Sequence, residues 1–114
     1  MMTASTLGPT LGQALDELIA TVRARANAPA DESYTASLLA GGPMKCAKKL
    51  GEEAVETALA AVSGKTTALA EETADLLYHL VVTLEACKTD PAEIAAILTR
   101  RQAQSGLAEK ASRH

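Results

Sequence analysis

Acidic side chains at helical spacing in two neighbouring stretches are the residues of this sequence best suited to chemistry. Glu52, Glu53 and Glu56 fall within a sector of roughly 100° on a helix that advances about 100° per residue. Glu72 and Asp75, further along the chain, are also neighbours on a helix surface. Mg²⁺ takes oxygen ligands and usually bridges carboxylates to substrate phosphates. The spacing therefore predicts a magnesium site shared by two facing helices, as helix bundles commonly build them.

The first group of acids has an alternative interpretation as an ordinary solvated helix face. Lys48 and Glu52, like Lys49 and Glu53, are four residues apart, which is the spacing of ion pairs on a helix surface. Lysine before glutamate is the less favourable order for such a pair, and this weakens the alternative only slightly. Taken alone, this helix favours the solvated face.

The second group is more informative because its helix is apolar over most of its circumference. Such a helix is expected to be buried, yet Glu72, Asp75 and His79 lie within about 60° of one another on a narrow polar stripe. Carboxylates withdrawn from water need cationic partners. The acids of the two helices outnumber the nearby lysines, and closely gathered like charges are costly unless a divalent ion offsets them. The second helix therefore favours a bound metal.

Helices are expected to position these acids, over about residues 11–26, 34–39, 43–62, 66–87 and 91–102. Gly41-Gly42-Pro43 is expected to stop the second segment, and Gly64 suits the left-handed cap that ends the third. Asp90 is a good N-cap for the last helix, with Pro91 in its first turn. No β-alternation appears, so the expected fold class is all-α: an antiparallel bundle of about four to five helices.

One domain is expected from a length of 114 residues. Its predicted parts are a disordered N-terminus over residues 1–10, an all-α domain over 11–104 and a polar tail over 105–114. The sequence has no Trp or Phe, and a core of Ala, Leu and Val buries little area per residue. We therefore expect a homodimer, in which a second copy covers part of the apolar surface.

Composition argues against several other classes of protein. A net charge of −3 gives no basic stripe for nucleic acid, so none is expected as a partner. No apolar run reaches the ~18 residues needed to cross a membrane, and the N-terminus lacks the pattern of a signal peptide. Cys46 and Cys87 have no metal-ligand spacing, and we interpret both as buried free thiols. A cytoplasmic location is the default expectation.

The acid pattern, EExxE followed by ExxD, resembles the all-α NTP pyrophosphohydrolases of the MazG-like superfamily. Further segments are similar to the phosphoribosyl-ATP pyrophosphohydrolase family in particular, and together with the acids they extend the resemblance over nearly the whole chain. These segments are SYTASLLAGG (33–42), KCAKKLGEEAVE (45–56), ADLLYHLVV (74–82) and RRQAQSGLAEKASR (100–113). The resemblance implies Mg²⁺-dependent hydrolysis of phosphoribosyl-ATP to phosphoribosyl-AMP and pyrophosphate, the second step of histidine biosynthesis.

Carried over to this sequence, the resemblance implies that Glu52, Glu53, Glu56, Glu72 and Asp75 are the metal-binding and catalytic acids. Either Glu53 or Glu56 is our candidate to orient or deprotonate the attacking water, because a general base needs only hydrogen-bond reach. Candidates for contacts with substrate are Tyr34, Thr35, Lys45, Lys48, Lys49, His79, Arg101, Lys110 and Arg113.

Structural alternatives stand beside these substrate contacts. Lys48 is as well interpreted as a surface lysine, His79 as a hydrogen-bonded structural histidine and Tyr34 as a buried anchor of its helical turn. The basic tail is also compatible with a mobile segment, and the resemblance favours substrate. Two other functions stay open: a house-cleaning pyrophosphohydrolase of free or damaged nucleotides, and a non-catalytic helical dimerisation module.

Overall fold

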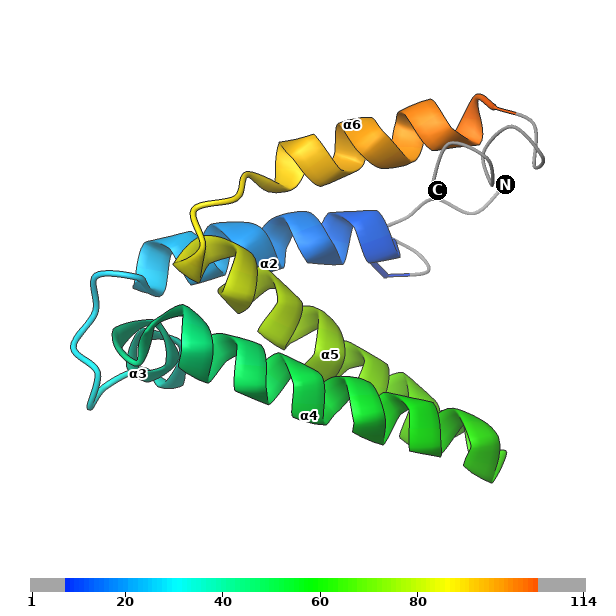
Figure 1. The fold of residues 1–114 in the computed structure, drawn as a ribbon, viewed down its shortest axis with the longest axis horizontal. Coiled ribbons are helices and arrows are strands. Elements are labelled where there is room, and N and C mark those ends of the chain that lie inside the picture. The colour runs from blue at the N-terminus through cyan, green and yellow to red at the C-terminus, as the bar shows by residue number, and fades with distance from the viewer. Residues whose placement is uncertain (1–7, 105–114) are drawn as a thin grey trace.

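Five helices make up the part of the chain that the structure describes, residues 8–104 of a computed structural model (Figure 1). Their bounds are α2 Leu11–Arg25, α3 Tyr34–Ala40, α4 Gly42–Ser63, α5 Thr66–Ala86 and α6 Pro91–Gln102. Residues 8–104 contain no strand. The all-α prediction is confirmed, and each helix begins and ends within one residue of its predicted position. Most of the predicted disordered N-terminus and all of the predicted tail, residues 105–114, lie outside the described residues.

Local signals set the helix ends. Thr10 and Gln13 form a reciprocal capping box at the start of α2, with hydrogen bonds of 2.9 and 3.1 Å. Asp90 accepts a hydrogen bond from the backbone N–H of Ala92, as predicted for the N-cap of α6. Gly64 ends α4 with a φ of 76°, a left-handed conformation that favours glycine. Because each signal depends on a few adjacent residues, sequence alone could place these ends.

The two longest helices, α4 and α5, pack side by side as an antiparallel hairpin (Figure 1). Near its base the hydroxyl of Thr83 on α5 donates to carbonyls of His79, 2.7 Å away, and of Cys46 on α4, 3.3 Å away. Helices α2 and α3 pack against this same end. The buried core lies where these four helices meet, and it consists of Val22, Leu38, Cys46, Val81 and Val82.

The other half of the hairpin has no such core. No residue from 47 to 78 is buried in the single chain. Val55, Leu59 and Val62 share one face of α4 and are 60%, 62% and 83% exposed. Helix α6 makes only sparse contact with the rest of the described chain, and it leaves Leu98 exposed. Two apolar helix faces are therefore without a partner inside one chain.

The cysteines differ in environment. Cys46 is buried and its thiol donates to the carbonyl of Leu38, 3.3 Å away; burial raises the pKa of this thiol. Cys87 is exposed, so the prediction that both thiols are buried is wrong for Cys87. It follows the last residue of α5, where the chain turns away from the core. Among the described residues, no helix is long and apolar enough to cross a membrane.

Candidate metal centre and active site

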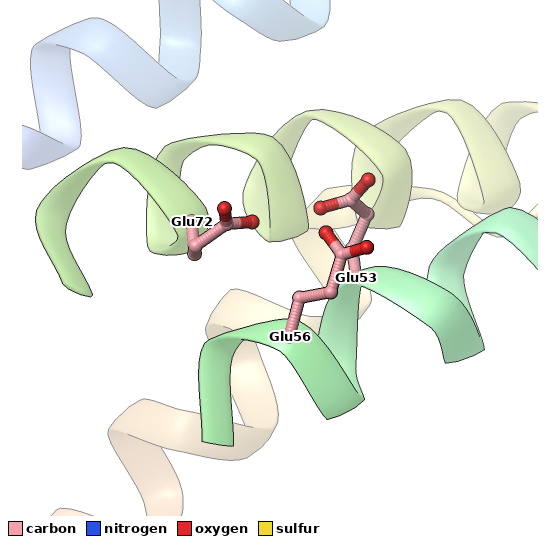
Figure 2. Close-up of side chains that lie close together, drawn as sticks. All are labelled: Glu53, Glu56 and Glu72. Carbon is pink, nitrogen blue, oxygen red and sulfur yellow. The ribbon is translucent and has the colours of Figure 1, made fainter. Parts of the chain in front are cut away.

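Three carboxylates from the two hairpin helices gather near the middle of the hairpin. Glu53 and Glu56 come from α4 and Glu72 from α5, and one oxygen of each lies within 4.8 Å of the others. Figure 2 shows these carboxylates turned toward the space between the two helices. We call these three residues the acid cluster. Residues 19 positions apart in sequence thus meet because α4 and α5 run antiparallel side by side.

The acid cluster is electrostatically unfavourable on its own. Desolvation raises the pKa of Glu72, and the carboxylates of Glu56, Glu53 and Asp75 raise it further. Desolvation likewise raises the pKa of Glu53, with Glu56 and Asp75 adding to the effect. Both burial and the neighbouring negative charges therefore disfavour the ionised forms of Glu53 and Glu72.

Unsatisfied oxygens show what the cluster lacks. Among the described residues, one buried carboxylate oxygen of Glu53 and one of Glu72 have no hydrogen-bond partner. Buried polar atoms are nearly always paired, and an unpaired one points to a bound ion or water. A divalent cation would satisfy these oxygens and offset the repulsion at the same time. Oxygen-only donors fit Mg²⁺, so the donor set agrees with the predicted metal.

The other two predicted metal acids are exposed and do not belong to this cluster. Glu52 is exposed, and its nearest cation is Lys49, with 3.8 Å between Nζ and Oε2. This pair forms in place of the expected Lys48–Glu52 pair. Asp75 is also exposed, although we expected its stripe to be withdrawn from water. Of the described helices, only α4 packs against this half of α5. It is still near enough to raise the pKa values of Glu53 and Glu72.

Thr57 is a feature of the site that sequence reasoning missed. Its hydroxyl donates to the backbone carbonyl of Glu53, 2.8 Å away, and to that of Glu72, 3.1 Å away. It therefore connects the two helices at the residues that carry the acids. The available signal was its position, one turn after Glu53 on the same face of the helix.

An aromatic group borders the site on the side of α3. His79 is 7% exposed, and its Nδ1 has no hydrogen-bond partner among the described residues. Its ring lies edge-on to Tyr34 and Tyr78, with centroids 6.2 and 5.1 Å away. Burial lowers the pKa of His79, and the Asp75 carboxylate opposes this effect. Tyr34 is 57% exposed, so the alternative of a buried anchor does not describe it.

Thr35 is 3% exposed and shares a 2.6 Å hydrogen bond with the hydroxyl of Tyr78. Its side chain is thus engaged inside the protein.

The predicted cationic residues are more scattered. Lys45 and Lys48 are exposed on α4, and Lys49 is half-buried. Arg101 is at the end of α6, which lies across α2 from α4 in Figure 1, so a single chain does not bring it to the acid cluster. Lys110 and Arg113 lie outside the described residues.

Known proteins resemble this chain over most of its length. A model of the family "Phosphoribosyl-ATP pyrophosphohydrolase" matches residues 15–102. Proteins named phosphoribosyl-ATP pyrophosphatase from Parvibaculum lavamentivorans and Methylobacterium nodulans are 56% and 58% identical to it over 99 residues. These matches cover 87% of this chain and 91% and 92% of the two relatives. A protein of the same name from Roseobacter denitrificans is 52% identical, over 87% of this chain and 94% of its own. The chain therefore belongs to the phosphoribosyl-ATP pyrophosphohydrolase family, a family of enzymes within the all-α MazG-like superfamily.

Proposed function

We propose that this chain hydrolyses the α–β phosphoanhydride of phosphoribosyl-ATP with Mg²⁺, giving phosphoribosyl-AMP and pyrophosphate as the second step of histidine biosynthesis. The acid cluster is the observation that carries the chemistry, because two of its buried oxygens have no partner among the described residues. The substrate comes from the names of relatives that are more than half identical to this chain.

The acid cluster would hold the metal, and Glu52 and Asp75, which lie outside the cluster, are proposed as further ligands. When bound, Mg²⁺ neutralises the triphosphate oxygens and the charge that develops on the leaving pyrophosphate. Glu56 is the exposed member of the cluster, and Glu53 is the half-buried one beside it. Either carboxylate can orient the attacking water or accept its proton, provided that the water lies within hydrogen-bond reach.

Cationic side chains would supply the remaining phosphate contacts. Lys45, Lys48 and Lys49 are within about one to two turns of the first acids on α4. Lysine binds phosphate as a point charge. The second ribose phosphate of the substrate is assigned to Arg101, Lys110 and Arg113. Since Arg101 does not reach the acid cluster of its own chain, we propose that it acts on the site of a second copy.

A homodimer is the proposed assembly, acting in the cytoplasm. The apolar stripe on α4, formed by Val55, Leu59 and Val62, is exposed in one chain, and few side chains of one chain are buried. Symmetric pairing of identical faces is the commonest way to cover such a stripe.

The acid cluster itself is tested by replacing two of the acids. The Glu56→Ala, Asp75→Ala double variant should release no measurable pyrophosphate from phosphoribosyl-ATP in Mg²⁺, with helical circular dichroism unchanged. Glu71→Ala is the matched control, because Glu71 is an exposed acid next to Glu72 that lies outside the cluster. Near-normal turnover by the double variant would overturn the site.

The choice of substrate is tested separately against the two rival functions. A house-cleaning pyrophosphohydrolase shares the acids, so phosphoribosyl-ATP and ordinary dNTPs should be compared side by side, and we expect a clear preference for the former. A non-catalytic dimerisation module would show no Mg²⁺-dependent rise in melting temperature, whereas a bound ion raises it by mass action.

A further inference from the structure

Aromatic side chains are scarce in this protein and are concentrated at one place. The sequence contains two tyrosines and no Phe or Trp, and both tyrosines belong to the aromatic group beside His79. The buried core is built from Val, Leu and Cys instead. Both tyrosine rings are thus gathered in one place, and only Tyr78 packs against the core.

The two rings are held differently. Tyr78 is half-buried and packs against the core, while Tyr34 is 57% exposed although it contacts two other rings. The planes of Tyr34 and Tyr78 are nearly parallel, at 16°, with centroids 6.3 Å apart. Tyr34 is therefore supported by two neighbouring rings, and the residue is still more than half exposed to solvent.

His79 connects this ring to the acids. It lies one turn after Asp75 on the same face of α5, and the Asp75 carboxylate interacts electrostatically with its ring. The order from α3 along α5 is thus the exposed Tyr34 ring, then the buried His79, then Asp75 and the acid cluster. The first end suits a flat aromatic ring, and the other suits a metal-bound phosphate chain.

We propose that Tyr34 is the platform on which the adenine ring of the nucleotide stacks, and that the hydroxyl pair of Thr35 and Tyr78 holds this platform in place. The inference rests on the proposed function and adds the direction of binding: adenine toward α3, and pyrophosphate toward Glu56 and Glu72. Adenine is the aromatic part of the substrate, and stacking on a protein ring stabilises a bound base.

Thr35 and Tyr78 are positioning residues in this arrangement. Their 2.6 Å hydrogen bond joins the first turn of α3 to α5, 43 residues further along the chain. Thr35 adjoins Tyr34 in sequence, and Tyr78 adjoins His79. The bond thus sets the distance between the platform and the helix that carries Glu72 and Asp75.

Kinetics of Tyr34 variants test the platform. Tyr34→Leu keeps bulk but removes the aromatic face, so we expect KM for phosphoribosyl-ATP to rise about ten-fold with kcat changed less than about two-fold, because the stacked ring is remote from the reacting phosphate. Tyr34→Phe should restore most of the lost affinity. An unchanged KM in Tyr34→Leu, or an equal loss in Tyr34→Phe, would overturn the stacking role.

Variants of the hydroxyl pair test positioning. Thr35→Val and Tyr78→Phe should each raise KM about three-fold, and the double variant should raise it no further than either single one, because both remove the same bond. Thr35→Ser should restore the wild-type KM. A fall in melting temperature without a rise in KM would show a purely structural role and overturn this part.

A binding measurement separates this inference from the proposed function. AMP carries the adenine but no anhydride, so it can be studied with Mg²⁺ without turnover. When aromatic ring protons are irradiated, saturation should transfer to adenine H2 and H8 in the wild type and in Tyr34→Phe. In Tyr34→Leu only the more buried ring of Tyr78 remains, so the transfer should fall several-fold. Absence of transfer in the wild type overturns the platform. Transfer without pyrophosphate release from phosphoribosyl-ATP overturns the proposed substrate and leaves the platform standing.

Discussion

The hydroxyl of Thr57 on α4 donates to the backbone carbonyl of Glu72 on α5, 3.1 Å away, at the centre of the hairpin. The same hydroxyl lies 2.8 Å from the carbonyl of Glu53. Both acceptors belong to acid-cluster residues whose side chains repel one another. This bond therefore holds two helices together at the point where their charges push them apart.

Thr57→Val keeps the shape of the side chain and removes the donor. We expect the free energy of unfolding to fall by about 1 kcal/mol, the usual net value of one hydrogen bond. The rise in melting temperature on adding Mg²⁺ should also become smaller, because the acids are less well held. Denaturant unfolding with and without Mg²⁺ measures both effects. Thr57→Ser, which keeps the hydroxyl, is the control; equal losses in the two variants would show that the methyl group matters instead.

Glu72→Gln should stabilise the metal-free protein while it abolishes activity. The amide removes one negative charge from the acid cluster and can donate to the unpartnered oxygen of Glu53. We expect the melting temperature in EDTA to rise by a few degrees, and the further rise on adding Mg²⁺ to be lost. Glu71→Gln, one position earlier and outside the cluster, should change neither quantity. A lower melting temperature of Glu72→Gln in EDTA would contradict the repulsion that we describe.

The raised pKa values of Glu53 and Glu72 predict how stability depends on pH. Their folded form binds protons more tightly than the unfolded chain does, so their contribution is fully present below the ordinary glutamate pKa of 4.5. It is lost as pH rises through the raised values. Metal binding requires the ionised acids, so stabilisation by Mg²⁺ should instead increase with pH.

Melting temperatures measured from pH 4 upward, with EDTA and with Mg²⁺, check both trends. His79 has a lowered pKa and contributes in the opposite sense, because its neutral form is lost as pH falls. The difference between wild type and a Glu53→Gln, Glu72→Gln variant isolates the two acids. If this difference in EDTA does not change with pH, the two carboxyl groups are not perturbed in the folded chain.

The helices could be predicted from sequence because their signals are local. Gly64 and Asp90 act within one turn of where they stand, and the spacing of Glu53 and Glu56 depends on one helix alone. The meeting of these acids with Glu72 followed from the short connection between α4 and α5, which makes an antiparallel hairpin the natural arrangement. Fold class and acid cluster were therefore within reach of sequence reasoning.

Contacts between distant segments were not within reach. Nothing in the sequence pairs Thr35 with Tyr78, since the bond depends on how α3 packs against α5. Asp75 was expected to be withdrawn from water because its helix is apolar, but α2 and α3 pack against one end of that helix and leave the half with Asp75 to α4 alone. Cys87 was misplaced for a similar reason: periodicity gives the face of a residue, and it does not say where the neighbouring helices stop.

The exposed apolar stripe on α4 predicts that Leu59→Glu will disrupt the homodimer that we propose. Leu59 is the middle residue of the stripe and is 62% exposed in one chain. A carboxylate there would be buried without a partner at a symmetric interface, at a cost of several kcal/mol, which weakens association by at least a hundred-fold. Sedimentation velocity at micromolar concentration should therefore show a dimer for the wild type and a monomer for Leu59→Glu. Leu11→Glu makes the same change at an exposed leucine on α2 and should remain dimeric, whereas a dimeric Leu59→Glu would exclude the α4 stripe as the interface.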